Sequence, residues 1–468
     1  MTDLRTRLQD ELGASVSFAP AELDRVRADR SGQRAPDRPL AVVRARTVDE
    51  VQRLLRLATE TGTPVVPRGA GTGLAGGGMG GAGAIVLDLS AMDRILELDP
   101  LDELAVVEAG VLNGDLDAAA RAHGLWYAPD PASRAISSIG GNIATNAGGL
   151  LCAKYGVTRE AVLGLAVVLA DGRLLRTGRR TVKGVTGYDL TALLTGSEGT
   201  LGVIVEATVR LRPVPAGEPV TIAAAFADLE AAAAACTAVI AARLRPAMLE
   251  LVDAGGLARI RAHLGDAAVA GTPIEHLAPG EAFVLAQADD TDAPATAAAI
   301  AEVLREAGGR VALAADAVTG ERLVAIRRAW HPALAASGEV LIEDVSVPRS
   351  RLADMFRAID EIGRRHGVEI PTLAHAGDGN LHPNFVYDGD EVPERVWAAA
   401  DDLFRAAVAL GGTLTGEHGV GILKRRWLRD ELGDDGLELQ RGIKALFDPA
   451  GILNPEVMFD PGVSRIPA

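Results

Sequence analysis

Apolar and polar positions alternate along the chain with two periods, one typical of helices and one typical of strands. Segment 39–73 begins with a short apolar run, continues with apolar residues three and four positions apart, and ends in a second apolar run. This pattern predicts strand, helix, strand. Thr47 and Glu50 form a capping-box pair at the predicted helix start, and Gly62 marks its end.

The same reasoning predicts further elements. In the first half, strands are expected over 84–90, 104–110, 162–172 and 200–215, with a helix over 113–124. After Pro213 and Pro215 the pattern resets, which marks a domain boundary. Beyond it, strands over 220–226, 282–288 and 311–318 alternate with helices over 228–244 and 292–308. This alternation predicts a separate α+β domain of the ferredoxin-like type.

Composition narrows the function classes. The chain has 468 residues, of which 48% are hydrophobic and 24% charged, a balance typical of globular proteins with large cores. A net charge of −16 argues against a nucleic-acid partner, because phosphates require a basic surface. Two cysteines, Cys152 and Cys236, are too few for a disulfide framework or for a cluster held by four cysteines. The charged start, residues 1–13, does not resemble a secretory signal, so a cytoplasmic location is expected.

Three glycine-rich segments in the first half suggest a ligand site. Residues 71–76, GTGLAG, match the dinucleotide-binding fingerprint, but more glycines follow where that fingerprint requires a helix. The segment is therefore either a bare surface loop or a loop whose backbone N–H groups converge on a pyrophosphate. Segments 129–149 and 195–204 add glycine, serine, threonine and asparagine, which suit the polar edges of a flavin. Three such segments favour the phosphate-binding interpretation.

The stretch 374–385, AHAGDGNLHPNF, places two histidines around a turn. The pair Asp378-Gly379 favours a two-residue hairpin turn. Folding about it would put His375 directly opposite His382, at a separation of roughly 5 Å between β-carbons. Two imidazoles at that separation can share a metal ion, although a closed site needs further ligands. The alternative is a pair of surface histidines beside a turn.

Taken in order, the motifs resemble those of a known family, the FAD-binding D-2-hydroxyacid dehydrogenases of the vanillyl-alcohol-oxidase flavoprotein superfamily. This family includes D-lactate dehydrogenases, the flavin subunit of glycolate oxidase and D-2-hydroxyglutarate dehydrogenase. The resemblance covers about residues 36–460 and rests on PRGAGTGLAGG, SSIGGNIATNAGG, KYG, GYDL, GSEGTLGVI, HAGDGNLHP, GEHGVG and FDPAGILNP.

The resemblance implies an α+β fold with a two-lobed FAD-binding domain of the vanillyl-alcohol-oxidase (PCMH) type and a ferredoxin-like cap domain. The expected boundaries are an N-terminal helical segment over 1–35, the FAD-binding domain over 36–217, the substrate or cap domain with the histidine hairpin over 218–416, and a segment over 417–468 that returns to the FAD domain.

The resemblance also implies how FAD is bound. Loop 68–73 would wrap the pyrophosphate, 138–149 would line the flavin, and 199–204 would lie near the adenine. Thr72 stands where some relatives attach FAD through a histidine, so non-covalent FAD is expected. The expected FAD-binding residues are Arg68, Gly69, Ala70, Gly71, Thr72, Gly73, Pro131, Ser138, Gly140, Gly141, Asn142, Thr145, Asn146, Gly148, Gly199, Gly202, Ile204 and Asn454.

For catalysis, the resemblance places a metal ligand at Glu417 and the catalytic base at His418. With His375 and His382, Glu417 would complete a set for Zn²⁺ or Mn²⁺ that leaves positions open for substrate. The implied reaction oxidises a D-2-hydroxy acid of the D-lactate, glycolate or D-2-hydroxyglutarate type to the 2-oxo acid. The metal would lower the pKa of the hydroxyl, His418 would take its proton, and the Cα hydrogen would leave as hydride to flavin N5. Asn380 would bind substrate or steady the hairpin.

The substrate carboxylate needs a cation. Arg327 stands at the position of the carboxylate-binding arginine of the family, and an exposed pair with Arg328 is the alternative. Val324 replaces a tryptophan that is common in the family, which changes the expected pocket. Other candidates for the cation are Lys424 and Arg425, which could equally belong to a solvated turn. For Glu343 and Asp344, the sequence is equally compatible with a structural role and with a functional one.

Electrons must leave by an external acceptor, namely solvent oxygen, a quinone, a cytochrome, an electron-transfer flavoprotein or an iron–sulfur subunit. The sequence is compatible with a homodimer and with association at a membrane through a partner. Two other functions are weighed against the dehydrogenase. A non-catalytic electron-transfer subunit of a larger complex should lack the hairpin histidines or Glu417, and all are present. An alcohol or aldose oxidase of the same superfamily would not need the metal.

Overall fold

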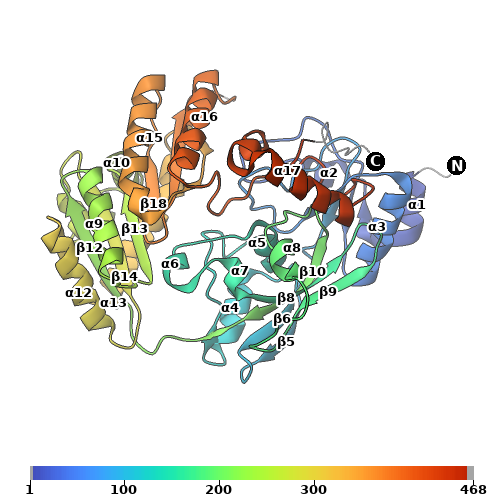
Figure 1. The fold of residues 1–468 in the computed structure, drawn as a ribbon, viewed down its shortest axis with the longest axis horizontal. Helices are drawn as coiled ribbons and strands as arrows, with labels where there is room; N and C mark the ends of the chain where they lie inside the picture. Colours follow the sequence, from blue (N-terminus) through green and yellow to red (C-terminus); the bar gives the residue numbers. More distant parts are fainter. Residues whose placement is uncertain (1–3, 390, 461–468) are drawn as a thin grey trace. The chain divides into compact units, whose positions relative to one another are not determined.

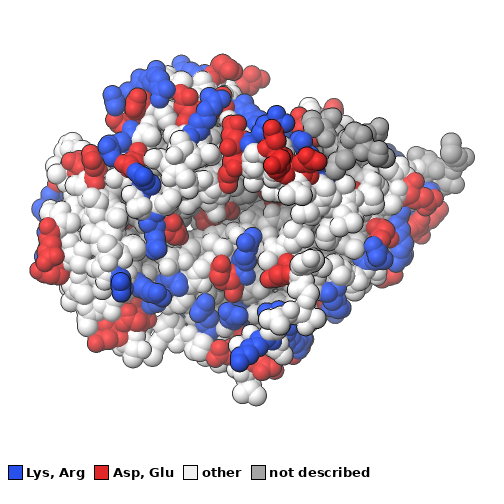
Figure 2. Space-filling model, viewed as in Figure 1, with Lys and Arg blue, Asp and Glu red and all other residues white. Residues whose placement is uncertain are grey.

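The computed structural model describes residues 4–389 and 391–460, which divide into two compact units (Figure 1). Of the described residues, the first unit contains 4–148, 157–214 and 417–460, and the second contains 149–156, 215–389 and 391–416. Acidic and basic side chains are interspersed over the face drawn in Figure 2. None of the helices in the described ranges combines the length and the apolar character needed to cross a membrane.

The first sheet of the first unit is built around a strand–helix–strand segment. Helix α3 (Val48–Thr61) starts where Thr47 Oγ1 accepts a hydrogen bond from the Glu50 backbone N–H at 3.2 Å, and it ends at Gly62 with φ 64°. These features confirm the prediction for 39–73. Leu54 and Leu55 of this helix are fully buried, and each contributes about 1.5–3 kcal/mol. The sheet order is β1 (Val16–Ser17), β2 (Ala41–Arg44), β4 (Ile85–Asp88) and β3 (Val65–Arg68), with β2 and β3 parallel to β4.

The second sheet of this unit is antiparallel and has the order β5 (Ile95–Asp99), β6 (Leu104–Glu108), β10 (Val203–Arg210), β8 (Val162–Val168) and β9 (Leu174–Gly178). A small ribbon pairs β7 (Leu125–Trp126) with β11 (Arg212–Pro213). Strands β5 and β9 were not predicted, because they are half exposed and lack a clear apolar pattern. The remaining helices are α1 (Leu4–Leu12), α2 (Pro20–Arg25), α4 (Asn113–Arg121), α5 (Ile139–Thr145), α7 (Thr158–Ala161), α8 (Leu190–Leu194) and α17 (Leu428–Phe447).

The second unit is an eight-stranded sheet whose strand pairs are all antiparallel. The order is β15 (Arg310–Leu313), β12 (Val220–Phe226), β14 (Ala282–Ala288), β13 (Met248–Val252), β18 (Thr372–His375), β19 (Asn380–Tyr387) and β16 (Glu339–Ile342), with β17 (Val345–Ser346) also paired to β19. The predicted strand over 311–318 is too long, because Asp316 accepts a hydrogen bond from the Thr319 N–H at 2.7 Å and starts a helix.

Helices α9 (Leu229–Ala241), α10 (Ala254–Leu264) and α12 (Ala293–Glu306) pack on the strands of this sheet (Figure 1). The indole of Trp330 is fully buried against α10, where a β-carbon at Gly256 would lie 1.8 Å from Trp330 Cζ3. The helices of this unit are α6 (Cys152–Tyr155), α9 (Leu229–Ala241), α10 (Ala254–Leu264), α11 (Asp266–Val269), α12 (Ala293–Glu306), α13 (Ala317–Arg328), α14 (Trp330–Ala335), α15 (Leu352–His366) and α16 (Glu394–Ala409).

Candidate active site

The histidine hairpin forms, but with a register that differs from the predicted one. His375 pairs with Asn380, and His382 pairs with Leu373, so the turn spans 376–379 rather than two residues. Of the two predicted turn residues only Gly379 has a positive φ, at 89°, whereas the tight turn would require it at both positions. The prediction that the two histidines face each other directly is therefore wrong.

The two imidazoles nevertheless lie together. His375 and His382 project from the same side of the sheet as diagonal neighbours, because Leu373 and His375 are two residues apart on one strand. Their ring centroids are 5.1 Å apart and the rings are nearly perpendicular. One ligand nitrogen of each lies within 4.8 Å of the other. Both side chains are buried, at 5% and 3% exposure, which contradicts the surface-histidine alternative.

A carboxylate that sequence reasoning missed holds His375 in place. Glu250 on β13 accepts a hydrogen bond from His375 Nδ1 at 2.8 Å and one from Arg327 Nε at 2.7 Å. Burial alone would raise the pKa of Glu250, but the charges and hydrogen bonds of Arg327 and His375 outweigh it and lower that pKa. The ionised carboxylate can only accept, so Nδ1 carries the hydrogen, and in the neutral ring the lone pair is on Nε2.

Arg327 is buried at 5% exposure near the end of α13, whereas Arg328 is exposed. The alternative of an exposed arginine pair is therefore wrong. Lys424 is also buried, at 2% exposure, which excludes a solvated turn for that residue.

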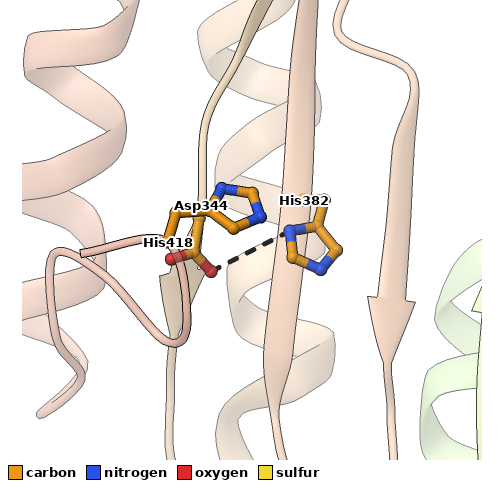
Figure 3. Close-up of side chains that lie close together, drawn as sticks. All are labelled: Asp344, His382 and His418. Carbon is orange, nitrogen blue, oxygen red and sulfur yellow. Dashed lines mark ion pairs between the residues drawn. The ribbon is translucent and has the colours of Figure 1, made fainter. Parts of the chain in front are cut away.

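A second buried carboxylate organises the other end of the hairpin. Asp344 accepts a hydrogen bond from Asn380 Nδ2 at 2.6 Å through Oδ1 and one from Thr415 Oγ1 at 2.7 Å through Oδ2. Figure 3 shows Asp344 pointing toward His382, whose Nδ1 is 3.9 Å from Asp344 Oδ1. The same Asn380 amide also donates to the backbone oxygen of Val345 at 2.9 Å. These contacts give Asn380 a structural role in the hairpin.

The chain passes from the second unit to the first between Gly416 and Glu417. A β-carbon at Gly416 would lie 2.1 Å from Asn380 Nδ2, so only glycine allows this close approach. In the first unit, a β-carbon at Gly148 would lie 2.3 Å from Glu417 Oε2. Glu417 Oε1 and Nε2 of His418, which Figure 3 also labels, are 3.9 Å apart. Glu417 follows Gly416 in the chain, and consecutive α-carbons are about 3.8 Å apart. The α-carbon of Glu417 therefore lies about that far from that of the packed glycine.

The glycine-rich segments of the first unit pack against one another. Ser138 caps helix α5 by accepting a hydrogen bond from the Gly141 N–H at 3.3 Å. A β-carbon at Gly69 would lie 2.3 Å from Ser138 Oγ and 3.7 Å from the Gly141 α-carbon. Gly71 has φ 70° and lies against the Arg68 guanidinium. The first two segments therefore meet at positions where a larger residue than glycine would clash.

The third segment joins them. Its Glu198 N–H donates to the Ala144 oxygen of the second segment at 2.8 Å. Asn454 Nδ2 donates to the backbone oxygens of Gly77 and Glu198, both at 2.9 Å. The Glu198 carboxylate accepts hydrogen bonds from the N–H groups of Val420 and Gly421, both at 2.8 Å. Burial of this carboxylate raises its pKa to about 7, although the two N–H groups act in the opposite direction.

These surroundings fit a large polar cofactor. Among the described residues, the buried polar atoms without a hydrogen-bond partner in the protein include Ser137 Oγ, Asn142 Nδ2 and Ser197 Oγ. All three belong to the second and third glycine-rich segments or adjoin them. The positions named for FAD thus include members that the structure brings together, chiefly Gly69, Ser138, Gly141 and Asn454. The roles of the whole set remain predictions.

The sequence contains a signal for two acidic residues that the predictions above do not include. Glu250 is the only charged residue in the strand MLELV, and such a residue is almost never fully buried unless it is paired. Glu198 lies within the glycine-rich stretch GSEGTLG. For Glu250, the isolated acidic residue inside an apolar run is thus a usable marker.

Two protein families match the chain. One, described as the FAD binding domain, matches residues 39–178. The other, described as FAD linked oxidases, C-terminal domain, matches residues 218–458, just over half of the chain. Together they confirm the resemblance seen in the motifs.

Relatives with similar sequences align over most of their own length. The glycolate oxidase subunit GlcD of Bacillus subtilis is 42% identical over 90% of this chain and 89% of that protein. A D-lactate dehydrogenase of Archaeoglobus fulgidus is 37% identical over 95% of this chain and 98% of that protein. The structure of p-cresol methylhydroxylase with bound substrate is similar in fold, with a TM-score of 0.79, 19% identity and coverage of 98% of this chain and 97% of that chain. The predicted fold class is confirmed.

Proposed function

The chain belongs to the family of FAD-linked oxidases, and from this premise we propose that it oxidises a D-2-hydroxy acid to the 2-oxo acid. One observation carries the proposal: two buried imidazoles share one face of the second unit, and a buried carboxylate fixes the proton of one of them. Relatives named for glycolate and D-lactate support a small 2-hydroxy acid as the substrate class. FAD supplies the two-electron acceptor for this chemistry.

In this proposal, His375, His382 and Glu417 hold a divalent metal, Zn²⁺ or Mn²⁺. The fit of the described side chains supports it, because imidazole and carboxylate are the preferred ligands of such ions and both imidazoles are buried with ligand nitrogens within 4.8 Å. Chain connectivity supports Glu417, which follows the packed Gly416 directly. A metal held there would lower the pKa of the substrate hydroxyl.

The remaining steps belong to side chains of this protein. His418 takes the hydroxyl proton, since imidazole is the side chain that most often serves as a general base near neutral pH. The guanidinium of Arg327 binds the substrate carboxylate, and its burial would strengthen that pairing. Asn380 keeps the hairpin strand in place through Asp344.

The electrons then pass to a partner or a diffusible acceptor. The two cysteines of the chain are too few for a cluster held by four of them. Several relatives are named as a subunit of glycolate oxidase, which supports transfer to another protein subunit.

Metal removal and replacement of one ligand test the proposal. The FAD-loaded protein is treated with a chelator, assayed for flavin reduction by D-lactate and glycolate, and then supplied with Mn²⁺ or Zn²⁺. Activity should be lost and restored, and His382→Ala should abolish both activity and metal content. His366→Ala is the matched control, because His366 is a half-buried histidine of the same unit that binds Asp402 at 2.7 Å.

The outcomes separate the competing functions. Reduction by D-lactate or glycolate that survives both chelation and His382→Ala would overturn the metal site. A metal-free flavin that alcohols or aldoses reduce, and hydroxy acids do not, would favour an alcohol or aldose oxidase. Bound FAD that no hydroxy acid reduces would favour a non-catalytic electron-transfer subunit.

A further inference from the structure

Glu250 occupies an unusual position for a charged residue. It lies at the centre of β13 (Met248–Val252), whose residues are all buried, and its own exposure is 0%. A buried charge is strongly destabilising unless partners compensate it, so the contacts of this carboxylate define its role. Its two oxygens serve different partners: Oε1 accepts from His375 Nδ1 at 2.8 Å, and Oε2 accepts from Arg327 Nε at 2.7 Å.

The contact with His375 is fixed by the sheet itself. Strands β13 and β18 are antiparallel, and their register pairs Glu250 directly with His375. Directly paired residues project from the same side of the sheet, so the carboxylate and the imidazole meet without a flexible linker. A carboxylate in this position orients a metal-binding imidazole, since the bonded Nδ1–H directs the Nε2 lone pair away from it.

The contact with Arg327 uses one edge of the guanidinium. Arg327 Nε and Nη2 both approach Oε2, at 2.7 Å and 2.5 Å. A guanidinium has five N–H groups in one plane. Because Nε and Nη2 pair with Glu250, the edge that carries Nη1 faces away from Glu250. That second edge has the fork geometry that binds a carboxylate through two hydrogen bonds.

We propose that Glu250 is a positioning residue that fixes two parts of the active site together: the direction of the metal-binding nitrogen of His375 and the direction of the substrate-binding edge of Arg327. This inference rests on the proposed function. The inference extends that function, because a single side chain, Glu250, would set the spacing between the metal and the subsite that binds the substrate carboxylate. Replacing Glu250 should therefore impair both functions, whereas replacing Arg327 should impair one.

The test uses the full-length, FAD-loaded protein. Mn²⁺ affinity is measured by titration calorimetry after metal removal, and KM and kcat are measured with D-lactate and glycolate. Glu250→Gln should weaken Mn²⁺ binding by about 10–100-fold, the usual effect of removing such a supporting group, and should also raise KM. Arg327→Lys should raise KM and leave Mn²⁺ affinity within about twofold, because the ammonium pairs with Glu250 but lacks the second edge.

Asp289→Asn is the control for damage to the unit. Asp289 is a buried carboxylate of the same unit that binds Lys154 and accepts a hydrogen bond from Tyr155 Oη at 2.6 Å. Its replacement should leave both Mn²⁺ affinity and KM unchanged. If Glu250→Gln does not fold, Glu250→Asp replaces it: the charge is retained, but a side chain shorter by one methylene cannot reach both partners, so at least one of the two constants should worsen.

Failure of this inference and failure of the proposed function give different results. Unchanged Mn²⁺ affinity and KM in the Glu250 variant, with metal lost in His382→Ala, would overturn the role of Glu250 and retain the metal site. A wild-type protein that binds no Mn²⁺ or Zn²⁺ would overturn both. A third result is metal binding that depends on Glu250 in a protein whose flavin no hydroxy acid reduces. It would support the part of the proposal that concerns the orientation of His375, and it would overturn the proposed substrate.

Discussion

A pair of substitutions tests whether the glycine-rich segments meet as described. Ala at position 69 would bring its β-carbon to 2.3 Å from Ser138 Oγ, well inside van der Waals contact. Removing that oxygen by Ser138→Ala leaves the Ser138 β-carbon at 3.6 Å, an ordinary contact. The clash of Gly69→Ala should therefore disappear in the double variant.

The expected magnitudes follow from these distances. Overpacking of this kind costs about 1–3 kcal/mol. Ser138→Ala alone removes the cap of α5, which costs about 1 kcal/mol. In the Ser138→Ala background, Gly69→Ala should be neutral or stabilising by about 0.4–1 kcal/mol, because alanine restricts the unfolded chain more than glycine. The two substitutions should thus be non-additive by about 1–3 kcal/mol.

Thermal unfolding of the FAD-free protein and titration with FAD provide the two readouts. Each kcal/mol should shift the unfolding midpoint by about 2–4 °C for a unit of this size. If the strain displaces the FAD loop, Gly69→Ala should also weaken FAD binding, by about tenfold for each 1.4 kcal/mol, and Ser138→Ala should restore it in part. A double variant as unstable as the sum of the two single variants would refute the described contact.

Three further expectations concern pH, packing and the junction of the loops. Because burial raises the pKa of Glu198 from its ordinary value of 4.5 to about 7, native protein binds this proton more tightly than unfolded protein does. The associated stability is complete below pH 4.5 and is lost as the pH rises to about 7, so wild type should lose about 3 kcal/mol relative to Glu198→Gln over that range in urea unfolding. Gly256→Ala should destabilise the second unit by at least about 1–3 kcal/mol, since its β-carbon would lie 1.8 Å from Trp330 Cζ3, and an unchanged midpoint would contradict the packing. Asn454→Ala removes two 2.9 Å hydrogen bonds, one of them to Gly77, and places alanine at φ 43°; it should weaken FAD binding more than Asn454→Gly, which accepts that φ.

The sequence was informative where local physics decides the structure. The capped helix α3, the first glycine loop without a helix and the separate antiparallel domain all follow from patterns of neighbouring residues. The hairpin register did not, because Asp378-Gly379 favours a tight turn only when no other contact competes. Here Gly377 N–H bonds to the Leu249 oxygen on another strand at 3.1 Å, and the loop widens.

Long-range pairing explains the other omissions. Glu250 and His375 are 125 positions apart in sequence, so their contact depends on how β13 and β18 are ordered in the sheet. Residues 149–156 belong to the second unit although they follow the FAD-binding motif directly, and their Lys154 pairs with the distant Asp289. No local sequence pattern predicts either of these two contacts.

The central claim is that this protein removes a hydride from a D-2-hydroxy acid at a metal-dependent site. The most direct measurement is anaerobic reduction of the bound flavin by matched D- and L-2-hydroxy acids, followed by loss of its visible absorbance with and without chelator. Rapid bleaching by a D-acid, much slower bleaching by its L-enantiomer and no bleaching after chelation are the expected results. A flavin that stays oxidised with every acid in the metal-loaded protein, or one reduced equally well after complete metal removal, would contradict the account.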